Sequence, residues 1–215
     1  MLAGAAIAAL VSAATATAGR DSYKVRMTAE GQAAARAVMP SKADIGAPSD
    51  WKGGATKPDI SNDLKCANYR PKVSDLVVTG AAAVTYKQPG LVISVQAAVL
   101  ASERMARLDW KRSIGARHYV DCSRAKIRKS MTGKQTFVSL RRLAIPQLGT
   151  VSSAYRTLVD VKTKIGKVRM AIDVLIFGRG RTEMAVITTM PLASVPTLAP
   201  NELVLAKTLV GRVRL

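Results

Sequence analysis

Hydrophobic and polar residues alternate with a period of two between residues 151 and 190, in three runs separated by Gly166 and by residues 178–181. This period is typical of half-buried β-strands. The middle run has apolar residues at five alternate positions: Val168, Met170, Ile172, Val174 and Ile176. Short breaks that contain glycine favour antiparallel pairing of consecutive strands over crossover helices. The pattern therefore predicts a β-meander whose apolar face is covered by other elements.

Weaker patterns predict the rest of the fold. Ser102 is a candidate helix N-cap, and Glu103 is favourable at the N-terminal end of the same helix. The remaining predicted elements are strands over 76–86, 91–100 and 136–143 and helices over 102–114, 122–131 and 201–213. We predict an α+β fold with an antiparallel sheet of about six strands, in the order β-β-α-β-β-β-β-α, covered by helices on one face.

The first 18 residues carry no charge and end in a small-x-small site, Ala16-Thr17-Ala18, which is typical of secretory signals. The basic leader of such a signal is missing, so either the natural start lies upstream of Met1 or the segment functions without it. An Ala-rich helical tail or a weak membrane anchor is the alternative. We predict a signal peptide over 1–18, a flexible, mostly irregular segment over 19–64 and the α+β domain over 65–215, with no transmembrane span in the mature form.

Two cysteines, Cys66 and Cys122, stand 56 positions apart. In an exported chain, an even pair is most simply a disulfide. The alternative is a metal site that adds His118, four residues before Cys122. Structural zinc sites usually bring four protein ligands and closely spaced cysteines, so we predict a disulfide, no metal site and no cofactor.

No catalytic motif stands out in the sequence. The nucleophile elbow G-x-S-x-G is missing, and His118 is the single histidine. Asp160 and Asp173 lie on neighbouring predicted strands, where they either converge or, more simply, are solvated or paired with Arg156 and Arg169. We predict no catalytic residue, which favours a non-enzymatic protein and leaves an enzyme open.

Positive charge is the strongest compositional feature. The chain has 33 Lys and Arg against 14 Asp and Glu, a net charge of +19, and the densest basic region lies between Lys111 and Arg142. This excess favours an anionic partner, although a merely solvated basic surface is an alternative. Nucleic acid is not favoured, because only 4% of residues are aromatic and none clusters among the basic ones. The candidate anion-binding residues are Arg124, Lys126, Arg128, Lys129, Lys134, Arg141 and Arg142.

A set of short motifs resembles a group of exported, uncharacterised actinobacterial proteins. The motifs are WKGG at 51–54, KPD at 57–59, Cys66, SDLVVTGA at 74–81, Cys122 and DVLIFGRGR at 173–181. The layout of elements is also similar to the photosystem protein PsbP and to mycobacterial envelope lipoproteins and kinase sensor domains. This resemblance implies a sheet with covering helices and a binding or scaffolding role without catalysis.

Together these patterns predict a secreted or cell-envelope binding module for an anionic or amphiphilic partner, such as lipid head groups or a cell-wall polymer. Two alternatives stay open. One is an envelope hydrolase with no recognisable motif. The other is a sensor domain for a small apolar ligand, which requires an uncharged cavity between sheet and helix.

Overall fold

The computed structural model describes residues 21–46, 51–61, 63–164 and 166–214. The predicted signal peptide lies outside these residues. The strands are β1 (Lys24–Val25), β2 (Lys52–Thr56), β3 (Val77–Gln88), β4 (Leu91–Leu100), β5 (Gln135–Leu143), β6 (Val151–Thr163), β7 (Gly166–Arg179) and β8 (Thr182–Pro191). The helices are α1 (Ala29–Ala37), α2 (Glu103–Arg112), α3 (Tyr119–Ser130) and α4 (Val195–Gly211), with short 3-10 turns at Ala43–Ile45 and Leu192–Ser194.

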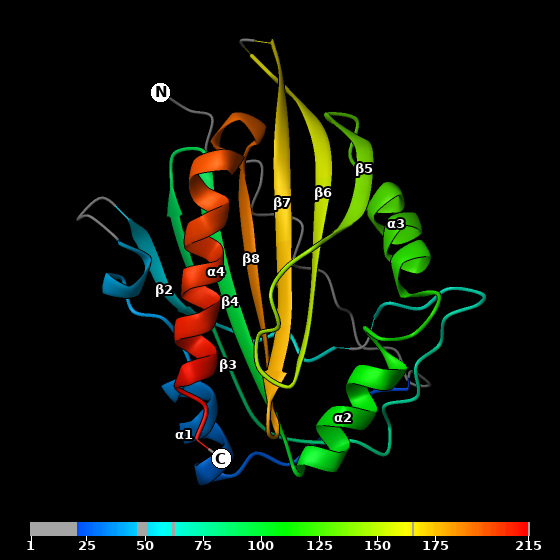
Figure 1. The fold of residues 1–215 in the computed structure, drawn as a ribbon. Coiled ribbons are helices and arrows are strands. Elements are labelled where there is room, and N and C mark those ends of the chain that lie inside the picture. Colours follow the sequence, from blue (N-terminus) through cyan, green and yellow to red (C-terminus); the bar gives the residue numbers. More distant parts are fainter. Residues whose placement is uncertain (1–20, 47–50, 62, 165, 215) are drawn as a thin grey trace.

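The strands of the described residues form one sheet in the order β1-β3-β4-β8-β7-β6-β5, with β2 beside β3. The predicted hairpin β3–β4 and the predicted meander β6–β7–β8 are both confirmed as antiparallel. β8 pairs with β4, so the meander returns to the hairpin and leaves β5 at the far edge (Figure 1). The sheet has eight strands rather than about six, because β1 and β2 come from the segment before the predicted domain.

That preceding segment, predicted to be flexible and mostly irregular, also contributes to the core. Ala35, Val38 and Trp51 are buried. α1 lies so close to β3 that a Cβ at Gly80 would lie 2.0 Å from the carbonyl oxygen of Gly31. Glycine at these two facing positions lets the backbones approach, and the structured part of the chain therefore begins before Cys66.

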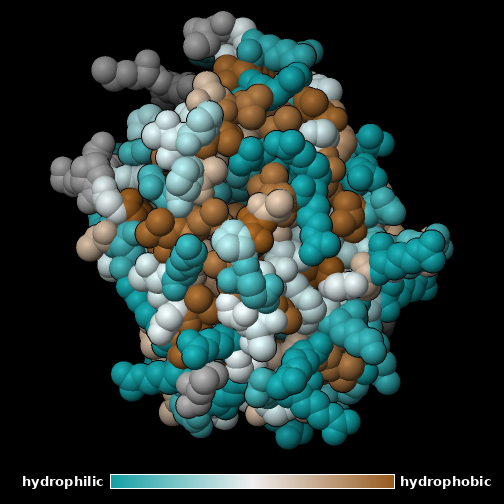
Figure 2. Space-filling model, viewed as in Figure 1, coloured by the Kyte–Doolittle hydropathy of each residue, from teal (hydrophilic) through white to brown (hydrophobic). Residues whose placement is uncertain are grey.

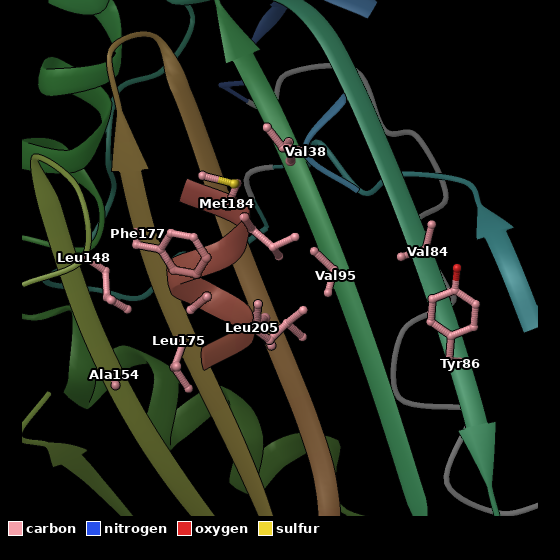
Figure 3. Close-up of a cluster of buried hydrophobic side chains, with 14 of the residues drawn as sticks. Val38, Val84, Tyr86, Val95, Leu148, Ala154, Leu175, Phe177, Met184 and Leu205 are labelled. Carbon is pink, nitrogen blue, oxygen red and sulfur yellow. The ribbon is translucent and has the colours of Figure 1, made fainter. Parts of the chain in front are cut away.

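The main core lies between α4 and one face of the sheet, which we call the α4 face. Leu205 of α4 packs in one cluster with Leu175 and Phe177 of β7 (Figure 3). Leu209 belongs to the same cluster. α4 begins at Val195 rather than at the predicted residue 201: Pro196 lies in the first turn, where a helix tolerates proline, and Pro200 lies inside the helix. On the surface of the molecule where α4 lies, hydrophilic residues surround scattered apolar ones (Figure 2).

The opposite face of the sheet, which we call the open face, carries the apolar stripe that the alternation predicted to be covered. Val168, Ile172, Val174 and Ile176 point to this face and are only half-buried, although Met170 is buried. α4 instead covers the alternate residues of the same strand. The prediction chose the wrong face for the core because both faces of β7 carry apolar side chains, and the docking of α4 decides which face packs.

Helices lie against both faces of the sheet rather than one. α2 contributes Asp109 beside Glu183 of β8, whose side chain points away from the buried Met184 and therefore onto the open face. The N-cap of α2 is Ser102, as predicted, and its side chain accepts a hydrogen bond from the backbone N–H of Met105. Among the described residues, no helix has both the length and the hydrophobicity needed to cross a membrane.

Candidate functional site: an apolar cleft on the open face

A cleft of about 180 Å³ lies between α3 and the open face of β5, β6 and β7. Most of the side chains around it are apolar or aromatic. The lining residues are Leu64, Tyr119, Ser123, Lys126, Ile127, Leu140, Tyr155, Thr157 and Val174. The sheet supplies the floor, because Leu140 pairs with Thr157 and Tyr155 pairs with Val174 across neighbouring strands.

The wall of the cleft follows from the periodicity of α3. Tyr119, Ser123 and Ile127 recur every four residues, which places them on one side of the helix. The predicted disulfide is confirmed: Cys66 and Cys122 are joined, with their Cα atoms 5.7 Å apart. The disulfide fastens the loop that carries Leu64 to α3, so it holds two sides of the cleft together.

Three tyrosines that are distant in the sequence lie together at the cleft, and two of them, Tyr119 and Tyr155, belong to its lining. The ring centroids of Tyr69 and Tyr119 are 6.0 Å apart, and those of Tyr119 and Tyr155 are 5.5 Å apart. Burial, and then the nearby Tyr155, raise the pKa of Tyr119 to about 12, so its phenol stays neutral. Sequence reasoning missed this cluster, since no local pattern links a loop, a helix and a strand.

One cation lies in the cleft lining. Lys126 is exposed on α3, and its Nζ donates a hydrogen bond to the backbone carbonyl oxygen of Asp63. Nearby, the guanidinium of Arg128 lies 4.8 Å from the ring centroid of Phe137 on β5. This cation–π contact joins α3 to the edge strand β5. Arg128 is therefore occupied by the aromatic ring, and Lys126 is the cation in the cleft lining.

The predicted anion-binding residues do not form one patch. Arg142 lies on the open face, opposite Tyr155, and donates to Ser153 Oγ at 3.3 Å. Arg141 alternates with it and therefore points to the α4 face. Arg124 pairs with Asp121 on the outside of α3 at 2.8 Å. The structure thus gathers the four cations of α3, Arg124, Lys126, Arg128 and Lys129, and places Lys134 in the turn before β5.

The catalytic candidates do not meet in the cleft. His118 precedes α3 and is not among the lining residues. The two aspartates take the simpler arrangement, pairing across β6 and β7: Arg156 with Asp173 and Arg169 with Asp160. Hydrogen bonds from Arg169 and Lys167 hold the pKa of the Asp160 carboxyl well below its usual range.

A buried polar cluster lies beneath α4, away from the cleft. Arg156 binds Asp173 through Nε to Oδ1 at 2.7 Å and Nη2 to Oδ2 at 2.5 Å. Glu202 of α4 is 6% exposed and faces this pair. Burial, and then the charge of Asp173, raise the pKa of Glu202 to about 8. The carboxyl is therefore protonated at neutral pH, and its enclosure under α4 assigns the cluster to stability rather than to catalysis.

This proton makes stability depend on pH. Between the ordinary Glu pKa of 4.5 and about 8, folded Glu202 keeps a proton that the unfolded chain has lost. The free energy of unfolding is therefore expected to fall as pH rises through this window, by about 2 kcal/mol between pH 6 and 8. In urea unfolding, Glu202→Gln should flatten the fall, whereas Glu103→Gln, at an exposed position on α2, should not. An unchanged slope in Glu202→Gln would contradict this assignment.

A second carboxyl pair lies under α2. Tyr23 donates its hydroxyl to Asp109, with distances of 3.0 and 2.8 Å to the two carboxylate oxygens. Burial raises the pKa of Asp109, and burial together with Asp109 raises the pKa of Glu183. Glu183 as a whole is half-buried, but its Oε1 is enclosed and has no hydrogen-bond partner among the described residues. The adjoining space is about 10 Å³, too small for an organic substrate.

No protein-family model matches the sequence, and no curated protein matches it significantly. Among solved structures, the chain is similar to the extracellular domain of PknH from Mycobacterium tuberculosis, at 10% identity and a TM-score of 0.44, over 85% of this chain and 95% of that one. It is also similar to the Rv0999 ortholog from Mycobacterium smegmatis, at 14% identity and a TM-score of 0.42, over 81% and 97% of the two chains. LpqN of Mycobacterium tuberculosis, involved in cell envelope biogenesis, gives 10% identity and a TM-score of 0.33, over 74% and 77%. At these TM-scores the similarities assign no ligand, activity or location to this chain.

Proposed function

We propose that the protein is an exported, non-catalytic module that binds an anionic amphiphile. The cleft beneath α3 takes the start of the hydrocarbon, and Lys126 takes the anionic head. The observation that carries the proposal is an apolar cleft with one cation, Lys126, among the described residues that line it. Ligand sites of this kind are mostly apolar, with a few polar groups that fix orientation.

Two further observations support this proposal. The Cys66–Cys122 disulfide favours an oxidising compartment outside the cytoplasm. Among the described residues that line the cleft, no carboxylate or histidine accompanies Ser123, so an acid-base pair for hydrolysis is not assembled there. The geometry therefore favours binding over the hydrolase alternative.

The apolar lining equally fits the second candidate, a sensor for a small neutral ligand. The two functions differ in how much the charge of Lys126 contributes to affinity. For an anionic head, its ammonium contributes about 1 kcal/mol at this exposed site, roughly fivefold in affinity. For a neutral ligand, the charge contributes little. A matched pair of ligands therefore separates them.

The test is calorimetric titration of the full chain with octanoate and with octanol. We expect octanoate to bind more tightly, with an affinity that falls as salt rises. Lys126→Gln should weaken octanoate roughly fivefold and leave octanol unchanged, since it removes the charge and keeps most of the side chain. The control is Lys129→Gln, an exposed residue of the same helix that is not in the cleft lining, which should change neither affinity.

Each other outcome has a definite meaning. If octanoate and octanol bind equally, and Lys126→Gln affects neither, the neutral-ligand sensor is supported and the anionic amphiphile is refuted. If Lys129→Gln weakens octanoate as much as Lys126→Gln does, the basic surface acts as a diffuse field and the cleft does not select the head. Binding of neither probe refutes the cleft as the site.

A further inference from the structure

The cleft adjoins a part of the open face that no helix of the described residues covers. Val174 belongs to the cleft lining, and the strand register continues from it across the sheet, to Ile187 of β8 and Ser94 of β4. A parallel row runs from Ile172 through Thr189 to Val92. We call these residues, with Ile176 and Ala185 beside them, the apolar shelf.

The apolar shelf is more exposed than the α4 face of the same strands. Its residues are half-buried, whereas most of their neighbours on the α4 face of the same strands are buried. Leu175 is 2% exposed, Val186 0% and Val95 1%. The two faces of the same three strands therefore differ in covering rather than in apolar character.

The apolar shelf also lacks charge. Its residues are apolar or carry small hydroxyl groups, in a chain with 33 Lys and Arg. An exposed sheet face in so basic a protein is expected to carry lysine or arginine at alternate positions. Contiguous apolar surface of this kind marks a site for a ligand or a partner.

The size of the cleft shows why the apolar shelf matters for the ligand. An apolar cavity of about 150 Å³ holds a molecule the size of benzene. The cleft, at about 180 Å³, is only slightly larger, and it is below the roughly 300–1,000 Å³ of common ligand pockets. A longer hydrocarbon that enters it must continue elsewhere, and the uncharged surface contiguous with it is the apolar shelf.

We propose that the hydrocarbon of the ligand runs from the cleft across the apolar shelf, so that the ligand class is a long-chain anionic lipid. This inference rests on the proposed function and deepens it. The first carbons lie beneath α3, near Tyr155 and Val174. The remainder crosses β7, β8 and β4, about 10 Å of sheet at the usual strand spacing. Contact on one side only makes each added methylene contribute less than in a closed tunnel.

The experiment is a chain-length series of carboxylates, from six to sixteen carbons, each titrated below its micelle concentration into the full chain. Full burial of a methylene is worth about 0.8 kcal/mol, roughly fourfold in affinity. We expect about twofold per methylene beyond eight carbons, since the apolar shelf covers about half of the chain surface.

A variant locates the effect. Ile172→Thr/Ile187→Thr makes the apolar shelf more polar and keeps β-branched residues suited to strands. It should abolish the gain beyond eight carbons and leave hexanoate binding unchanged. The matched control is Val204→Thr, at a position of α4 that is 63% exposed on the other side of the sheet, which should keep the full series.

The outcomes separate this inference from the proposed function. If wild-type affinity stops rising at eight carbons, the apolar shelf is not used, while binding in the cleft stands. If affinity keeps rising but the Thr variant keeps the full gain, the chain follows another path and the inference is wrong. If no chain length binds, both proposals fail. The wild-type series decides the first point even if the double variant does not fold.

Discussion

Replacing Arg156 by methionine is expected to lower the free energy of unfolding by about 3–5 kcal/mol, because it leaves a buried carboxylate without its partner. Asp173 is 0% exposed, and each of its two carboxylate oxygens accepts a hydrogen bond from Arg156. Methionine keeps much of the side-chain volume, so the loss reports the charge rather than a cavity. Urea unfolding at pH 7 measures it directly.

The same two strands contain a matched control. Arg169 binds Asp160 at 2.7 Å in a similar cross-strand pair, but its side chain is 45% exposed and Lys167 also contacts Asp160, at 2.8 Å. Arg169→Met should therefore cost less than about 1 kcal/mol. Equal losses in the two variants would show that burial beneath α4 does not set the strength of the Arg156 pair.

Removing the disulfide by Cys66→Ser/Cys122→Ser is expected to lower the free energy of unfolding by up to about 4 kcal/mol. The physical reason is that the cross-link closes a loop of 56 residues in the unfolded chain and restricts its freedom. Urea unfolding of the oxidised wild type and of the variant gives the difference. Equal midpoints and slopes would contradict a stabilising role.

The same double variant should weaken ligand binding more than it disturbs the packing of the main core. Leu64 stands two residues from Cys66, and α3 carries Cys122, so both cleft walls lose their common fixing point. The main cluster beneath α4 contains neither cysteine. We expect octanoate affinity to fall while the variant still unfolds cooperatively in urea, as a packed core does. Unchanged affinity in the folded variant would show that the loop and α3 hold their places without the cross-link.

Local periodicity was enough to predict most of the elements. The alternation in residues 151–190 predicted the meander, and Ser102 marked the start of α2, because strand and helix repeats are set by backbone geometry within a few residues. The disulfide was predictable because the chain has only two cysteines, which can pair in one way. The ion pairs Arg156–Asp173 and Arg169–Asp160 were predictable because opposite charges on adjacent strands pair across the ladder.

The sequence could not indicate how deeply those charges are buried or where the cleft lies. Charged residues in a strand indicate solvent, and only the packing of α4 over Asp173 encloses that pair. The cleft draws Leu64, Tyr119, Tyr155 and Val174 from a loop, a helix and two strands. No short stretch of the sequence contains all of them. The binding site was therefore predicted at the basic residues of α3, and the tyrosines were not among the candidates.

By itself, the sequence determined the α+β class, the hairpin, the meander, the disulfide and the basic character of α3. The tertiary structure alone decided which face of the sheet is packed, which cations lie near the cleft, and which part of the apolar surface stays open. The physical reason lies in β7, where Leu175 and Phe177 on one face and Ile172 and Val174 on the other are equally suited to a core. Alternation shows that the two sets point apart, but the docking of α4, which begins at Val195 after a further strand, chooses between them.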